Sequence, residues 1–267
     1  MGTLVCFHAH PDDESISTGG TIARAVAEGH RVVLVIATNG DHGELPADLA
    51  HGETLVDRRR AETARSAEVL GVHRLAWLDY ADSGMTGWEQ NDHPRSFVQA
   101  PLEEAAASLA AILREEAADV LTVYDWHGNY GHPDHIKVHT VGHRAAELAG
   151  TPAVFEATMN RDDMKRFFQE AKNQGVNPQP EGEEWDPDGP ADDGNPMGTP
   201  EAEITHRVDV SDYVLTKKAS IACHRSQVTD AGFFMSLPDE AFKFAFGTEW
   251  FIRKGATHPL RDGWLFE

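Results

Sequence analysis

The chain has 267 residues, 40% hydrophobic and 25% charged, which is typical of a globular protein and excludes fibrous, collagen-like and wholly disordered chains. Its net charge of -21, from 23 Lys+Arg against 44 Asp+Glu, would repel phosphate backbones and anionic lipid, so we expect no nucleic-acid and no membrane partner. With two cysteines, no basic leader and no run of about 18 apolar residues, the sequence predicts a soluble, cytoplasmic protein without a disulfide framework.

Predicted strands and helices alternate from the N-terminus onward. A strand over 4–9, a helix over roughly 17–28 closed by Gly29, and a β-branched strand over 31–38 form a βαβ unit with parallel strands. Helices near 53–70, 102–117 and 133–149 then alternate with strands near 74–78, 120–124 and 153–158. This order predicts an α/β fold with an open, mostly parallel sheet and helices on both faces.

The alternation is interrupted at about 173–203, a stretch rich in Gly, Pro and acidic residues. It holds nine Asp+Glu and no Lys or Arg, so we interpret it as either a mobile flap beside the site or a solvated insertion. After it we expect a strand at 204–210, a helix over 211–223 with Ser211 as its N-cap, and a closing strand at 247–253. Without a repeat or a second core, residues 1–267 are predicted to form a single domain.

Two of the predicted strand ends carry unusually many polar side chains. HAHPDDE (8–14) follows the first strand, and DWHGNYGHPDH (125–135) follows the strand over 120–124. Ligands of open α/β sheets bind beyond the carboxyl ends of the strands. We therefore expect these two turns, each with a His-Pro-Asp unit, to share one rim of the sheet.

Two imidazoles and one carboxylate with open positions are a frequent ligand set for a catalytic Zn²⁺. His10 and Asp13, three residues apart in a tight turn, can converge on one ion, and His135 would complete the set from the second turn. Asp12 would then lie beside the metal as a general base that deprotonates a metal-bound water. The same set also accepts Fe²⁺.

Three other interpretations stay open. The acidic residues at 12–14 could cap the following helix, although capping gives no reason for His10. His135, His139 and His143 fall at i, i+4 and i+8, so one helix face could ligate a metal by itself. TGGT (18–21) occupies the turn where a dinucleotide would bind, but it lacks the G-x-G-x-x-G spacing and more readily allows close helix–sheet packing.

Seven motifs give the chain a resemblance to the PIG-L (LmbE-like) zinc deacetylases over almost its whole length, except the acidic stretch. They are AHPDDE (9–14), TNGDHGE (38–44), RRRAETARSAEVLGV (58–72), DSGM (82–85), YGHPDH (130–135), KKASIACHRSQV (217–228) and GTEWF (247–251). The resemblance implies a Rossmann-like sheet. It also implies that His10, Asp13 and His135 bind zinc and that Asp12 is the general base.

The resemblance assigns roles to further residues. It implies that His132 is a cationic stabiliser or acid near the tetrahedral intermediate, that Asp134 orients it, and that Tyr130 donates to the developing oxyanion. Contacts to a sugar substrate are expected, on the same basis, from Glu44, Arg59 and Asp82. Carboxylates do accept hydrogen bonds from vicinal hydroxyls, but the two acids could also be loop or capping residues, and Arg59 could lie on a solvated helix face.

Ser17 and DSGM resemble the mycothiol-pathway branch that deacetylates N-acetylglucosaminyl-inositol more than the amidase branch that acts on mycothiol S-conjugates. We therefore predict a zinc-dependent hydrolase that removes an acetyl group from such an amino-sugar conjugate, its small-molecule partner. The alternatives are that amidase, a deacetylase of another N-acetyl sugar, and a non-catalytic metal-dependent sugar-binding protein. Whether Asp12 alone or Asp12 with His132 transfers the protons stays open, as does the oligomeric state.

Overall fold

A mixed sheet organises the chain in the computed structural model, which describes residues 1–173, 186–227 and 235–266. The described strands follow the order β3-β2-β1-β4-β5-β7-β6-β8. Their bounds are β1 (Thr3–His8), β2 (Arg31–Thr38), β3 (Arg74–Tyr80), β4 (Val120–Tyr124), β5 (Ala153–Thr158), β6 (His206–Asp209), β7 (Thr248–Arg253) and β8 (Arg261–Asp262).

The first five strands form the parallel part of the sheet. β1 lies between β2 and β4, β3 pairs with β2, and β5 pairs with β4, all in parallel. The predicted bounds of β2, β4 and β5 are confirmed, and β1 and β3 differ from prediction by one or two residues. Strands covered on both faces need continuous apolar runs, and for this reason the sequence located them well.

The C-terminal strands depart from the prediction. β7 is antiparallel to both β5 and β6, and β8 lies at the edge beside β6. The strand expected at 247–253 is confirmed as β7, but it does not close the fold, because β7 is an interior strand and β8 follows it in the chain. Pairing between strands so distant in sequence is decided by packing and not by local pattern.

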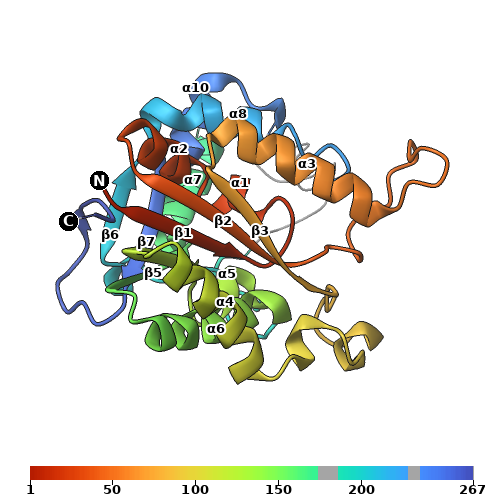
Figure 1. The fold of residues 1–267 in the computed structure, drawn as a ribbon. Helices are drawn as coiled ribbons and strands as arrows, with labels where there is room; N and C mark the ends of the chain where they lie inside the picture. The colour runs from red at the N-terminus through yellow and green to blue at the C-terminus, as the bar shows by residue number, and fades with distance from the viewer. Residues whose placement is uncertain (174–185, 228–234, 267) are drawn as a thin grey trace.

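Helices cover both faces of the sheet (Figure 1). Helices α2, α3, α8 and α10 lie on one side and α4 and α6 on the other. The bounds are α1 (Asp13–Ser17), α2 (Gly19–Ala27), α3 (Leu55–Leu70), α4 (Leu102–Glu115), α5 (Gly128–Gly131), α6 (Pro133–Ala149), α7 (Arg161–Asn173), α8 (Val214–Ile221) and α10 (Asp239–Phe246). No described helix is both long and apolar enough to cross a membrane.

Alternation along the strands builds two hydrophobic cores on this one sheet. In β1, Val5 and Phe7 face the core beneath α4 and α6, whereas Leu4 and Cys6 face the core beneath α2 and α3. The prediction of helices on both faces of an α/β sheet is thus confirmed.

Several helix ends differ from prediction. The helix expected over 17–28 begins at Asp13 and is divided at Thr18 into α1 and α2. Ser211 is not an N-cap, because residues 211–213 form a 3-10 turn and α8 begins only at Val214. Helices α7 and α10 were not among the predicted elements. The end of α3 was located well, since Gly71 ends it with a left-handed φ of 76°.

Part of the acidic stretch packs against the rest of the chain. Residues 174–185 lie outside the described residues, so neither interpretation is tested there. Farther along, Asp192 N donates to Tyr130 O at 3.0 Å and Gly198 N donates to Asn129 O at 2.6 Å. The interpretation as a solvated insertion is therefore wrong for 192–198, which adjoin the loop that carries Tyr130.

Candidate active site

The turn after β1 brings His10 and Asp13 together. Asp13 Oδ2 accepts a hydrogen bond from His10 N at 2.7 Å, which closes the turn. Asp12, between them in sequence, has φ 114° and ψ -32°, a conformation that residues other than glycine rarely adopt. Asp12 and Asp13 thus lie at the start of α1, and the turn also fixes the positions of their carboxylates.

The turn after β4 directs His135 back toward the first turn. Asp125 Oδ1 accepts hydrogen bonds from His127 N and Asn129 N, at 3.2 and 2.9 Å, and shapes the loop. Gly128 has φ 66°, and a Cβ at this position would collide with His135. Pro133 then begins α6, so His135 lies in the first turn of that helix.

The ligand atoms of the three predicted metal ligands form an almost equilateral triangle, here called the donor triangle. His10 Nδ1 lies 3.3 Å from Asp13 Oδ2 and 3.3 Å from His135 Nε2. The remaining pair, His135 Nε2 and Asp13 Oδ2, is 3.4 Å apart. Zinc binds such atoms at about 2.0–2.2 Å with tetrahedral angles, which separates them by about 3.3–3.5 Å. The buried donor triangle therefore fits a metal ion with a fourth position left open.

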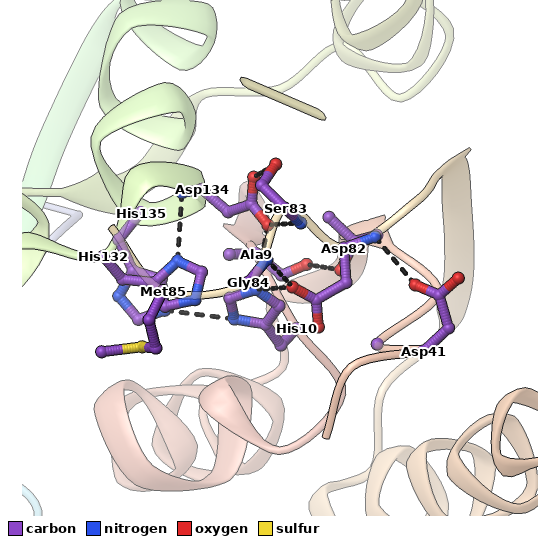
Figure 2. A network of polar contacts seen from close by, with 12 residues as sticks. Ala9, His10, Asp41, Asp82, Ser83, Gly84, Met85, His132, Asp134 and His135 are labelled. Carbon is purple, nitrogen blue, oxygen red and sulfur yellow. Dashed lines mark hydrogen bonds and ion pairs between the residues drawn. The ribbon is translucent and has the colours of Figure 1, made fainter. Parts of the chain in front are cut away.

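Hydrogen bonds behind His10 fix the orientation of its ring (Figure 2). Asp134 Oδ2 lies 3.2 Å from His10 Nε2, on the nitrogen that faces away from the donor triangle. Ser83 holds that carboxylate in turn, through its backbone N at 2.9 Å and its hydroxyl at 2.5 Å. Metal-binding histidines usually have such a partner on the second nitrogen.

Two overlapping donor sets also have atoms within 4.8 Å of one another. They are His10, His132 and His135, and His10, Asp82, His132 and Asp134. In the second set, Asp82 and Asp134 approach His10 through Nε2. Because one ring cannot present both nitrogens to the same ion, these carboxylates fit a supporting position better than a ligand position.

The electrostatics of the site favour a cation. Burial lowers the pKa of His10, but neighbouring carboxylates, above all Asp82, outweigh it and raise that pKa well above its ordinary value. Burial raises the pKa of Asp13, but His135 and His10 outweigh it and hold that pKa well below its usual range. Metal binding displaces protons from such ligands, so a site that holds an extra proton can also hold a metal ion.

Asp12 lies at the edge of this cluster with Arg59 against it. Arg59 Nη2 donates to Asp12 Oδ2 at 3.1 Å and to Pro11 O at 2.5 Å, and Nη1 donates to Gly40 O at 2.9 Å. Burial raises the pKa of Asp12 to about 6, while Arg59 acts in the opposite direction. The alternative that Arg59 lies on a solvated face is wrong, because the residue is 3% exposed. Its contacts favour support of Asp12 over direct contact with a sugar.

Tyr130 and His132 adjoin the donor triangle. The Tyr130 hydroxyl lies 3.5 Å from His135 Nε2, and the His132 ring meets the His10 ring edge-on at 4.5 Å. Burial, then His10 and His135, lower the pKa of His132 to about 2. These surroundings disfavour the cationic His132 that the resemblance implies.

Asp134 contacts His132 through its backbone. His132 Nδ1 accepts a hydrogen bond from the Asp134 backbone N at 3.1 Å, whereas the Asp134 carboxylate contacts His10 and Ser83. Asp134 therefore contacts His132 through its backbone N and not through its carboxylate. An accepting Nδ1 leaves the ring proton of His132 on Nε2.

The two remaining predicted substrate contacts lie at different depths. Asp82 is 5% exposed and reaches to 3.5 Å from His10 Nε2. Glu44 is exposed, and its backbone N donates to Gln227 Oε1 at 3.1 Å. Gln227 belongs to KKASIACHRSQV, the motif that also holds the buried His224. Neither Gln227 nor His224 was a predicted site residue, and only the resemblance of this motif could have indicated them.

The histidines that follow along α6 lie apart from the donor triangle. His143 Nε2 is 2.8 Å from Glu156 Oε1, and His139 Nδ1 is 3.0 Å from the Tyr124 carbonyl oxygen. The alternative of one helix face that ligates a metal with His135 is therefore wrong, since His135 points to His10 and Asp13. His8 is also occupied, with Tyr124 and Thr18 hydroxyls each 2.8 Å from its ring nitrogens.

Comparisons with known proteins agree with this site. The family model PIG-L, described as GlcNAc-PI de-N-acetylase, matches residues 5–146. A 1D-myo-inositol 2-acetamido-2-deoxy-alpha-D-glucopyranoside deacetylase from Saccharomonospora viridis is 40% identical over 237 residues, 85% of each protein. A deacetylase of the same name from Nocardiopsis dassonvillei is 38% identical. The match covers 96% of this chain and 95% of that protein.

A solved structure with a similar fold is the N,N'-diacetylchitobiose deacetylase from Pyrococcus horikoshii, in complex with its inhibitor. It has a TM-score of 0.60 and 25% identity, and the match covers 94% of this chain and 83% of that one. The family match includes both turns that form the donor triangle. Together with the identities of 38 and 40% over most of two relatives, this establishes that the chain belongs to the PIG-L family of deacetylases, which are amide hydrolases.

Proposed function

We propose that this chain is a zinc-dependent N-deacetylase that hydrolyses the acetamido group of N-acetylglucosaminyl-inositol. One observation carries the proposal: the donor triangle has the spacing of a tetrahedral metal site, and Asp12 adjoins Asp13 in the same turn. The names of the two curated relatives support the choice of substrate. His10, Asp13 and His135 are the proposed ligands.

Asp12 is the proposed general base. Zn²⁺ held by the donor triangle would polarise the amide carbonyl and lower the pKa of its bound water toward ~7. Asp12 accepts a proton from the attacking water as the water oxygen bonds to the acyl carbon. A pKa of about 6 suits this task, because such a carboxylate is mostly ionised at neutral pH yet still basic enough to take the proton.

Tyr130 and His132 stabilise the negative charge that develops on the acyl oxygen. Both lie beside the donor triangle, and each offers one donor, the Tyr130 hydroxyl and His132 Nε2–H. When the C–N bond breaks, the amine nitrogen needs a proton. A neutral imidazole is a poor acid, so we assign this proton to Asp12, which thereby carries it from the water to the amine. Acetate and a free amino sugar are the products.

Substrate binding is assigned to Asp82 and Glu44. Their carboxylates can accept hydrogen bonds from sugar or inositol hydroxyls, Asp82 close to the donor triangle and Glu44 from the exposed loop that contacts Gln227. Arg59, which contacts Asp12 and two backbone carbonyls, is assigned to support of the base.

Metal analysis coupled to an amine-release assay tests the proposal. The panel is N-acetylglucosaminyl-inositol, a mycothiol S-conjugate and N,N'-diacetylchitobiose, with His135→Ala as the variant. We expect one metal ion per chain, amine release that is fastest from the first compound, and loss of both in the variant. Faster cleavage of the S-conjugate would replace deacetylase by amidase, and a wild type without bound metal would overturn the proposal.

A further inference from the structure

Next to Asp12 the structure has a buried carboxylate–imidazole pair that the proposed chemistry does not use. Glu14 is 0% exposed and His224 is 2% exposed. Glu14 Oε1 accepts a hydrogen bond from His224 Nε2 at 2.8 Å, although the two residues are 210 positions apart in the chain. A buried carboxylate needs hydrogen-bond donors such as His224. Glu14 also contacts Asp12.

The other oxygen of Glu14 holds the backbone of Asp12. Glu14 Oε2 accepts a hydrogen bond from Asp12 N at 3.0 Å. This is the residue whose φ of 114° is rare outside glycine, and such conformations persist only where surrounding contacts fix them. The hydrogen bond to Glu14 is a contact of this kind, and it acts on the residue that carries the proposed base.

Glu14 itself is anchored to two helices that lie far from it in sequence. Its Oε1 accepts hydrogen bonds from the hydroxyls of Ser15, at 3.0 Å, and of Ser66 in α3, at 2.5 Å. Ser220 of α8 lies 2.8 Å from the Ser66 hydroxyl and joins the same network. His224 follows α8 by three residues. The Glu14 carboxylate thus links α3 and α8 to the turn after β1, and the packing of these helices fixes its position.

We propose that Glu14 and His224 are positioning residues that hold Asp12 in the conformation in which its carboxylate reaches the attacking water. The inference depends on the proposed function, in which Asp12 is the base. Arg59 holds the carboxylate end of Asp12 at 3.1 Å, and Glu14 holds its backbone end at 3.0 Å. With both ends held, the base does not have to be oriented anew in each turnover.

A second buried pair offers a matched control. Lys217 Nζ donates to Glu249 Oε1 at 2.6 Å, and the two residues are 2 and 3% exposed. Glu249 also accepts hydrogen bonds from Gly20 N and Thr21 N, at 2.9 and 2.8 Å. This pair therefore holds the first turn of α2 as Glu14 holds Asp12, but these hydrogen bonds do not reach the donor triangle or Asp12.

The kinetic test compares Glu14→Ala, Glu14→Gln and Lys217→Met on N-acetylglucosaminyl-inositol. We expect Glu14→Ala to lower kcat about 10- to 100-fold, with KM and zinc content unchanged. Glu14→Gln should lose less of kcat than Glu14→Ala, because its amide oxygen can still accept from Asp12 N although its amide nitrogen cannot accept from His224. Lys217→Met should lower Tm and leave kcat within about twofold of wild type, as expected of a group that contacts no reacting atom.

Three outcomes would overturn the inference. They are an unchanged kcat in Glu14→Ala, a kcat that falls only in step with zinc content, and an equal loss of kcat in Lys217→Met. If Glu14→Ala does not fold, His224→Ala provides the test: it removes one of the anchors of Glu14 and should lower kcat by a smaller factor than expected for Glu14→Ala, with KM and zinc content unchanged.

Crystal structures of the zinc-loaded wild type, Glu14→Ala and Glu14→Gln test the inference without any substrate. We expect the φ of Asp12 to leave the positive region in Glu14→Ala and to keep it in Glu14→Gln. An unmoved Asp12 in Glu14→Ala would overturn the positioning role even if the enzyme is active. A wild type that is inactive on every substrate would instead overturn the proposed function, while a displaced Asp12 would still show that Glu14 holds it.

Discussion

Among the described residues, two clusters of two histidines and one carboxylate can be compared, and α6 contributes to both. One is the donor triangle, and the other consists of His139, His143 and Glu156, whose donor atoms also lie within 4.8 Å of one another. In the second cluster, His143 Nε2 and Glu156 Oε1 are 2.8 Å apart, a hydrogen-bond distance, whereas His139 Nδ1 is 3.9 Å from that oxygen. The two clusters are alike in composition but not in geometry.

The difference shows what a metal site needs beyond its residue types. In the donor triangle, the three atoms are equally spaced, and His10 has Asp134 on its other nitrogen. In the second cluster, His143 is already paired with Glu156, and the nearer nitrogen of His139 contacts the Tyr124 carbonyl oxygen. The 2.8 Å between His143 Nε2 and Glu156 Oε1 suits a hydrogen bond, whereas two ligand atoms of one zinc ion lie about 3.3–3.5 Å apart.

The largest expected effect comes from breaking the donor triangle. His135→Ala should lose the bound metal and, because water is then no longer activated, should lower amine release by about 10³-fold or more. Metal content by mass spectrometry and initial rates check both parts. A variant that keeps one metal ion at wild-type affinity would contradict the ligand assignment.

Asp12→Asn should separate the base from the metal. The amide side chain keeps the size of Asp12 but cannot take a proton, so kcat should fall by about 10²–10⁴-fold. Metal content should remain at the wild-type value, which distinguishes this variant from His135→Ala. Retention of kcat would assign the base elsewhere.

Tyr130→Phe should remove one donor to the developing oxyanion. We expect kcat to fall by about 10²–10³-fold, with KM and metal content close to wild type, since the interaction strengthens only in the transition state. Steady-state kinetics on N-acetylglucosaminyl-inositol measure this effect, and a change confined to KM would argue for a binding role.

The pKa of Asp12 predicts the acidic limb of the pH–rate profile. Burial raises this pKa to about 6, and the base works only when ionised. The sign follows: kcat/KM should be constant above that pH and should fall about tenfold per unit below it. The limb should disappear from the residual activity of Asp12→Asn. A limb that persists there belongs to another group.

The second cluster provides the smallest effect. His143→Ala should leave metal content unchanged and amine release within about twofold of wild type. Loss of its largely buried contact to Glu156 should lower the free energy of unfolding by about 1–3 kcal/mol, measured by urea titration. Loss of a metal ion in this variant would show that the second cluster also binds one.

Much of this protein was determined by local sequence. The bounds of β2, β4, β5 and α6 were predicted without error, because strands buried on both faces require apolar runs and because Pro133 and Gly150 mark the two ends of α6. The meeting of His10, Asp13 and His135 was predicted for a related reason. Parallel strands bring their carboxyl ends to one edge, so two polar turns after neighbouring strands must converge.

Only the tertiary structure decided which partners these groups have. The place of β7 inside the sheet, the burial of Arg59 against Asp12 and the contact of Asp134 with His10 all join segments far apart in the chain. The same is true of Glu14 and His224. Local pattern records the period of an element and the chemistry of its residues, whereas the partner of a buried polar group depends on how the elements pack. For this reason the residues of the donor triangle could be predicted from the sequence, and the contacts that hold Asp12 could not.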